Sequence, residues 1–339
     1  MSRLCLILLC LVAPLAAAPT PAAYATPAGP WKVGTLEQTW HDATRNRAVP
    51  VKIYYPTGSG APGTCPVIVF SHGLGGSREG YRYLGECWAS HGYISVHVQH
   101  PGSDSAILSG LHPRRSFQKA IADPANSINR PLDISFAIDR LTALNADAAF
   151  PLYRHLDLAR LGVAGHSFGA FTTMAVAGTR LPVLGGDPKY RDPRIKAAIA
   201  MSTPAASGDQ TSAPFDDVRI PVFHMTGTKD ELPSARQGGA ATGDLGMTNA
   251  SARRRPFDRT QHATAYLLTF DGGDHMVFSG RFATPRPLDP EFQALVCAGS
   301  VAFWNAYLRG DGEARKWLDD GGFATALGPL GRFEQKHPQ

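Results

Sequence analysis

Charged side chains are scarce in this chain of 339 residues. They make up 18% of it, against roughly 25% in an average soluble protein, and the net charge of +5 is mild. The sequence has no long block of Lys and Arg, no zinc-ligand spacing and no aromatic-basic RNA-binding motif, so we expect no nucleic-acid partner. Its 35 Gly and 27 Pro stay below the share of low-complexity chains, about 25–30%. With 43% hydrophobic residues, the composition predicts a globular chain with a large core.

The apolar run at the start of the chain is too short to cross a membrane as a helix, which needs about 20 residues. Arg3 precedes an apolar stretch over Leu4–Leu15 that ends in small residues, the pattern of a secretory signal peptide. We favour cleavage at the Ala-x-Ala site that ends at Ala25 over an earlier site that a proline follows. We therefore expect residues 1–25 to be a signal peptide, 26–339 to be a single domain, and the protein to be periplasmic or extracellular. An uncleaved membrane anchor is the alternative.

Cysteine is also rare, and this cleavage divides its five residues. Cys5 and Cys10 would leave with the signal, so that Cys65, Cys87 and Cys297 remain in the mature chain. An odd number allows one disulfide at most within a monomer and leaves one thiol over. An exported protein lies in a compartment where this disulfide is permitted.

Short apolar runs alternate with helical patterns along the mature chain. Val33–Trp40 and Val49–Tyr55 alternate in polarity and predict an antiparallel pair of strands, whereas Val67–Phe70 is continuously apolar, as in a strand buried on both faces. The alternation of strands and helices predicts a mostly parallel sheet with helices on both faces. Further strands are expected at Tyr93–Val98, Leu161–Ala164, Ile195–Met201, Val222–Thr226 and Ala265–Phe270, and helices at Glu79–Ser90, Leu132–Leu144, Ala170–Gly178 and Pro290–Leu308.

Two long stretches, Ser103–Asn129 and Glu231–Gln261, have no clear period and each follow a strand end. Irregular stretches of this length in a compact domain are commonly lids or pocket walls, and a variable surface loop is the alternative. The tail after Asp311 is expected to add one surface helix. The predicted sheet would place the helices of Cys87 and Cys297 on the same side, which makes these two the favoured disulfide pair.

A serine between two glycines is the strongest chemical signal. Gly165-His166-Ser167-Phe168-Gly169 follows the strand Leu161–Ala164 and opens a helix. The sharp strand-to-helix turn that lifts such a serine above the sheet requires small neighbours two positions away on either side. The helix N-terminus beneath it favours developing negative charge. We predict that Ser167 is a nucleophile and that His166 is structural.

A glycine-rich loop also follows the buried strand Val67–Phe70, in Ser71-His72-Gly73-Leu74-Gly75-Gly76. In hydrolases with a serine turn of this kind, this loop supplies one backbone N–H of the oxyanion hole, and the residue after the nucleophile supplies the other. Such fixed donors stabilise the tetrahedral intermediate of acyl transfer. We assign the two donors to Leu74 and Phe168, and we expect His72 to order the loop.

The base and the acid are expected after later strands. His275 follows the strand Ala265–Phe270 through flexible glycines, which allow its loop to reach over the strand ends. Asp230 follows the strand Val222–Thr226 and would accept the other ring N–H of His275. The resulting order of Ser167, Asp230 and His275 is the hydrolase order of nucleophile, acid and base. Asp209 is a distant second choice for the acid.

At these residues the chain resembles the α/β-hydrolase superfamily. It is most similar to the branch of predicted dienelactone hydrolases and lipoprotein-associated platelet-activating-factor acetylhydrolases, over roughly Pro66 to Gly178. The similarity rests on Phe70-Ser71-His72-Gly73-Leu74-Gly75, Ala89-Ser90-His91-Gly92-Tyr93 and the Ser167 turn. It implies the α/β-hydrolase fold and an exported serine esterase with Leu74 and Phe168 as oxyanion donors.

Two departures from this branch limit what the resemblance implies. Dienelactone hydrolases use a cysteine nucleophile, whereas this chain has Ser167. In the acetylhydrolases the acid follows the strand after the serine helix, and there this chain has Ala200-Met201-Ser202, without a carboxylate. The acid therefore has to come from the next strand, at Asp230, and neither substrate specificity is carried over.

The sequence thus predicts a secreted carboxylic-ester hydrolase that acts through an acyl-enzyme, with no metal and no organic cofactor. Its partner would be a small-molecule or lipid ester, and association with a membrane surface is compatible with this activity but not required. The alternatives are an acyltransferase or peptidase on the same scaffold and a catalytically silent binding protein. Arg114-Arg115 and Arg253-Arg254-Arg255 are expected to be solvated surface charge, with binding of an acidic group or membrane surface as the alternative.

Overall fold

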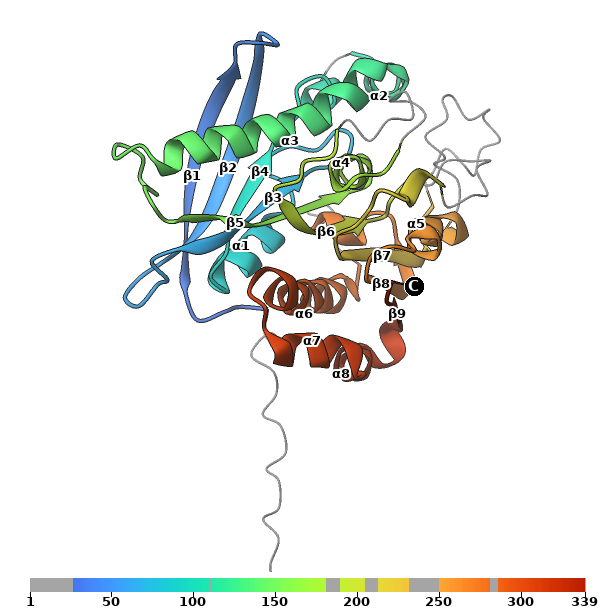
Figure 1. Ribbon diagram of the computed structural model, residues 1–339. Coiled ribbons are helices and arrows are strands. Elements are labelled where there is room, and N and C mark those ends of the chain that lie inside the picture. The colour runs from blue at the N-terminus through green and yellow to red at the C-terminus, as the bar shows by residue number, and fades with distance from the viewer. Residues whose placement is uncertain are drawn as a thin grey trace, which may run out of the picture.

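A sheet of nine strands forms the centre of the computed structural model (Figure 1). Its strands follow one another in the order β1-β2-β4-β3-β5-β6-β7-β8-β9. They are β1 (Lys32–Asp42), β2 (Arg47–Thr57), β3 (Cys65–Ser71), β4 (Ile94–Val98), β5 (Leu156–His166), β6 (Ile195–Met201), β7 (Val222–Lys229), β8 (Ala265–Asp274) and β9 (Gly331–Lys336). The structure describes residues 27–109, 111–180, 190–204, 213–231, 250–280 and 286–338, so the predicted signal peptide lies outside it.

The six inner strands, β4, β3, β5, β6, β7 and β8, run parallel. All residues of β3 and β4 are buried, which accounts for the continuously apolar run Val67–Phe70 in β3, whereas β4 also buries Ser95 and His97. The predicted antiparallel pair, β1 and β2, extends one edge, and β9 pairs antiparallel with β8 at the other. The prediction of an α/β fold with a mostly parallel sheet is confirmed.

Helices cover both faces of this sheet (Figure 1). α3 and α4 pack on one face, and α1 and α6 pack on the other, where α7 and α8 flank α6. The helices are α1 (Arg82–Ser90), α2 (Pro113–Ala122), α3 (Pro124–Asn145), α4 (Phe168–Ala177), α5 (Arg255–Arg259), α6 (Asp289–Leu308), α7 (Gly312–Asp319) and α8 (Gly322–Leu327). None of the helices in the described part of the chain combines the length and the apolar character needed to span a bilayer.

The stretch Ser103–Asn129, predicted to be irregular, is largely helical. It contains α2 and the first turn of α3. Both helices begin with a proline, Pro113 and Pro124, and proline at the first helical position costs no hydrogen bond because that N–H has no intrahelical acceptor. The prediction was wrong because proline is common both in loops and at the first position of a helix, so these residues alone do not distinguish the two.

The later long stretch and the tail also differ from expectation. Within Glu231–Gln261, residues 250–259 form a short 3-10 turn and α5, and 232–249 lie outside the described residues. After Asp311 the chain forms two helices and then β9, rather than one helix. β9 reads GRFEQK, which lacks the apolar alternation of a strand because it lies at the sheet edge.

A disulfide joins Cys87 of α1 to Cys297 of α6, as favoured from the sequence. The two Cα atoms lie 6.2 Å apart, although 210 residues separate them along the chain. The bond therefore ties together the two helices that cover one face of the sheet. Cys65 is a buried free thiol at the start of β3.

One buried histidine of β7 makes the stability of this core sensitive to acid. His224 is 1% exposed, and neither of its ring nitrogens has a hydrogen-bond partner among the described residues. Burial lowers its pKa from 6.5 to about 3. Between these two values the unfolded chain binds a proton that the folded chain does not, so the free energy of unfolding falls as the pH falls through 6.5.

We predict that His224→Leu stabilises the protein. At pH 7 the gain should be about 1 kcal/mol, because a buried group without a hydrogen bond is removed. Below pH 6 it should grow by up to about 1.4 kcal/mol per pH unit. Urea unfolding between pH 4 and 8 measures this, with the exposed His337→Leu as control. A difference from the parent that does not change with pH would contradict the account.

Candidate active site

The predicted site residues meet at one edge of the sheet, because parallel strands end together there. Ser167 follows β5, Asp230 follows β7 and His275 follows β8. The loop predicted to form the oxyanion hole begins at Ser71, the last residue of β3. These residues are far apart in the sequence, and the topology alone brings their strand ends to this edge.

Ser167 occupies a strained turn between β5 and α4. Its φ of 56° and ψ of −117° lie outside the regions that a serine normally adopts. A Cβ on Gly165 would overlap with the carbonyl oxygen of Gly169, and a Cβ on Gly169 would overlap with that of Ser71. The glycines of the motif are therefore required by close approach of backbone to backbone, as the sequence predicted.

His275 connects the serine to the acid. Its Nε2 lies 2.9 Å from Oγ of Ser167, and its Nδ1 lies 2.8 Å from Oδ1 of Asp230. Ser167 is 9% exposed and His275 6%, whereas Asp230 is fully buried. The structure thus brings the three residues into one hydrogen-bonded chain that is buried at the acid and reaches solvent at the serine.

The Asp230 carboxylate is stabilised as an anion. Burial alone would raise its pKa, but the hydrogen bond to His275 and the positive charge of Arg253 outweigh it and lower the pKa to about 2. Its Oδ2 accepts hydrogen bonds from the hydroxyls of Ser202, at 2.6 Å, and Thr226, at 2.9 Å. The acid therefore stays ionised at neutral pH without contact with water.

Ser202 was noted in the sequence only for the absence of a carboxylate at the end of β6. It lies there with a φ of 54° and holds the carboxylate that the next strand supplies. This position thus still contacts the acid, through a hydroxyl group. A sequence signal existed, since Ser202 follows a strand at the same edge, but its contact with Asp230 depends on the register of β6 and β7.

Arg253 corrects the prediction of solvated surface charge. It is 4% exposed, and its Nε lies 2.8 Å from Oδ1 of Asp230. Its Nη1 donates to the carbonyl oxygen of Ser202 at 2.6 Å. The neighbouring Arg254 is half-exposed and pairs with acidic side chains, and Arg114 and Arg115 are exposed on α2, as predicted.

His166 has the structural role predicted for it. Its Nε2 donates to the carbonyl oxygen of His275 at 2.8 Å, and its Nδ1 accepts from the Tyr81 hydroxyl, also at 2.8 Å. The same hydroxyl accepts from the N–H of Gly73 at 3.2 Å. Burial, followed by the nearby charge of His275, lowers the pKa of His166 far below 6.5, so it stays neutral. His166 thereby ties the loop of the base to the loop after β3.

The side chains of the two predicted oxyanion donors belong to one apolar cluster. Phe168 is the first residue of α4, so its backbone N–H has no acceptor within the helix. The Leu74 side chain packs against the cluster that Phe168 and Phe171 form. His72 orders the loop, as expected, because its Nε2 accepts from the N–H of His100 at 3.1 Å.

Potential metal ligands gather at one place in the described part of the chain, away from this edge. Cys87, His91 and Cys297 have ligand atoms within 4.8 Å of one another. The two sulfurs are joined in the disulfide and offer no thiolate. The hydrogen-bonded groups around Ser167 lie apart from these three residues.

Comparison with known proteins identifies the family. A family model described as PET hydrolase-like matches residues 14–265, about three quarters of the chain. The chain belongs to the PET hydrolase-like family. The family lies within the α/β-hydrolase superfamily and is similar to the dienelactone hydrolases, so the predicted resemblance is confirmed.

A curated relative agrees with this family. The platelet-activating factor acetylhydrolase of the dog, Canis lupus familiaris, is 28% identical over an alignment of 202 residues, and the match covers 50% of this chain and 41% of that protein. The matched part thus spans about two fifths of the relative's length. The predicted enzyme class, a carboxylic-ester hydrolase, is that of both the family and this relative.

The two neighbouring arginines allow a test of the Asp230 environment. We predict that Arg253→Met destabilises the protein by about 3–5 kcal/mol, because it leaves a buried carboxylate without its cation. Arg254→Met should cost less than about 1 kcal/mol, because its ion pairs are half-exposed. Urea unfolding at pH 7 measures both, and equal losses would contradict the buried pairing.

Proposed function

We propose that this protein is a secreted serine hydrolase of carboxylic esters. The observation that carries the proposal is the hydrogen-bonded chain from Ser167 through His275 to Asp230, set beside the loop of Leu74. Each of these three residues supplies one function: Ser167 a hydroxyl that attacks, His275 a ring nitrogen that takes the proton, and Asp230 an anion that orients the ring. Membership of the PET hydrolase-like family supports the same reaction class.

The proposed reaction has two halves. Oγ of Ser167 attacks the ester carbonyl while Nε2 of His275 takes the hydroxyl proton. The backbone N–H groups of Leu74 and Phe168 stabilise the oxyanion, and the imidazolium of His275 gives the proton to the leaving alcohol. Water then attacks the acyl-enzyme by the same route, with Asp230 stabilising the charged ring throughout.

Support for an ester substrate comes from the names of the family and the relative. One names the hydrolysis of PET and the other an acetylhydrolase, and both concern acyl esters. For this chain we propose a small-molecule or lipid ester. Export is part of the proposal: Arg3 and Leu4–Leu15 have the pattern of a signal peptide, and a disulfide is compatible with an oxidising compartment.

Substitutions of the triad test this proposal. Ser167→Ala should reduce turnover of a p-nitrophenyl ester series by at least about 10³-fold, because only the oxyanion hole and binding would remain. Asp230→Asn should cost about 10⁴-fold, because the amide favours the wrong ring tautomer. The control is Asp274→Asn. Asp274 is next to His275 in the sequence, but its carboxylate pairs with Arg286.

Each assay has an outcome that would reject an assignment. Turnover unchanged in Ser167→Ala would reject the nucleophile, and a larger loss in Asp274→Asn than in Asp230→Asn would reject the acid. A parent protein that neither turns over any ester nor reacts with a fluorophosphonate would favour a silent binding protein. Addition of an alcohol distinguishes hydrolysis from acyl transfer, because a transferase would form the new ester in preference to the acid.

A further inference from the structure

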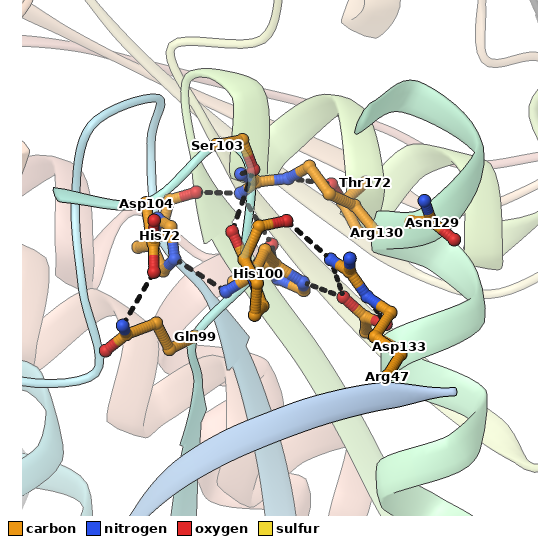
Figure 2. A network of polar contacts seen from close by, with 12 residues as sticks. Arg47, His72, Gln99, His100, Ser103, Asp104, Asn129, Arg130, Asp133 and Thr172 are labelled. Atoms are coloured by element: carbon orange, nitrogen blue, oxygen red, sulfur yellow. Dashed lines mark hydrogen bonds and ion pairs between the residues drawn. The ribbon is translucent and has the colours of Figure 1, made fainter. Parts of the chain in front are cut away.

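A second polar cluster lies buried against the loop after β3 (Figure 2). Its centre is Arg130 of α3, whose side chain is fully buried. The guanidinium uses all three nitrogens: Nε donates to Oγ1 of Thr172 at 3.0 Å, Nη1 to Oγ of Ser103 at 2.9 Å, and Nη2 to Oγ of Ser71 at 3.2 Å. Nη2 also donates to the carbonyl oxygen of His72.

Part of this cluster has the same residue types as the site. Oγ of Ser71 lies 3.0 Å from Nε2 of His100, and Nδ1 of His100 lies 2.9 Å from Oδ2 of Asp133. All three residues are fully buried, so no substrate reaches this serine. Burial lowers the pKa of His100 to about 4, so its single ring proton points to Asp133 and Ser71 donates to Nε2. The hydrogen bonds of Ser71, His100 and Asp133 therefore fix the loop after β3, and Ser71 does not act as a nucleophile.

Arg130 contacts both segments that carry the predicted oxyanion donors. On the loop side it binds the carbonyl oxygen of His72, two residues before Leu74. On the helix side its guanidinium carbon lies 4.5 Å from the centre of the Phe168 ring. Thr172, which accepts from Nε, itself donates to the carbonyl oxygen of Phe168 at 3.0 Å. One rigid, planar group thus sets the separation of the two segments.

The charge of Arg130 is not explained by an ion pair. No carboxylate among the described residues forms an ion pair with it: Asp133 pairs with Arg45, Arg47 and His100, and the charges of Asp133 and Asp104 act on Arg130 only from a greater distance. A buried cation without such a partner is costly to stability. Burial lowers the pKa of Arg130 to about 9, so the group is still charged at neutral pH. The position of Arg130 between the loop after β3 and α4 offers a reason for a buried charge that lowers stability.

We propose that Arg130 is a positioning residue of the oxyanion hole, which holds the N–H groups of Leu74 and Phe168 in convergent directions through His72, Thr172 and the Phe168 ring. The inference rests on the proposed function, since it assumes an acyl substrate at Ser167. It adds a charged group, supplied by a helix outside the predicted motifs, to the determinants of the rate.

Two substitutions test the proposal. Arg130→Lys keeps the charge but loses the planar fork, and Thr172→Val keeps the shape but breaks the link to Phe168. Both should lower kcat about 10- to 100-fold, because small misplacements of catalytic groups have effects of this size, and KM should change less than about threefold. Turnover is expressed per site titrated with a fluorophosphonate, so unfolded protein does not count.

A second readout separates positioning from a structural role. A trifluoromethyl ketone forms a tetrahedral adduct with a nucleophilic serine and places an oxyanion in the hole, whereas the corresponding alcohol does not. The variants should bind the ketone more weakly in proportion to the loss in kcat and bind the alcohol unchanged. A purely structural role would lower the melting temperature and leave the ratio of ketone affinity to alcohol affinity as in the parent. That result would overturn the proposal.

Arg309→Lys is the matched control. Arg309 also donates to two backbone carbonyls, those of His91 and Gly92, and lies 4.2 Å from the Tyr93 ring centre, but at the opposite end of β4. It should lower stability and leave kcat within about twofold. If Arg130→Lys does not fold, Thr172→Val decides: kcat within about twofold of the parent overturns the proposal. A parent that fails to react at Ser167 would instead overturn the proposed function.

Discussion

Backbone touches backbone where the turn after β5 meets the loop after β3. A side chain on Gly169 would overlap with the carbonyl oxygen of Ser71, and one on Gly165 would overlap with Gly169 itself. This contact fixes the strained conformation of Ser167, which costs about 1–3 kcal/mol and persists because the surroundings impose it. It also sets the distance between the loop of Leu74 and the first turn of α4, on which any oxyanion hole here depends.

Two buried polar groups surround this contact, and both contain an arginine. On the acid side, Arg253 and Ser202 hold the Asp230 carboxylate from a short turn and from the end of β6. On the side of the predicted oxyanion donors, Arg130 contacts both the loop after β3 and α4. His166 joins the two sides, because it hydrogen-bonds both Tyr81, next to the loop, and the backbone of His275. The site is therefore rigid through polar contacts as well as through packing.

The sequence was most informative where one short segment carries the whole constraint. β3 could be predicted because burial on both faces gives it a continuously apolar run, and the turn of Ser167 could be predicted because it needs glycines at fixed positions. β9 was missed because an edge strand needs no apolar alternation, and α2 was missed because its starting proline is common both in loops and at helix starts. The contacts of Arg253 and Arg130 could not be predicted from the sequence, because their partners lie on other elements and only the fold brings them together.

The most direct test of the central claim is to trap the acyl group. Intact and peptide mass spectrometry, after rapid mixing with p-nitrophenyl acetate and an acid quench, would show where the acetyl group is attached. The account predicts one acetyl group on the peptide that contains Ser167 in the parent protein, and none in His275→Ala, in which the proton acceptor is missing. Steady release of p-nitrophenol with the acetyl group on another residue, or with none on Ser167 under any quench condition, would contradict it.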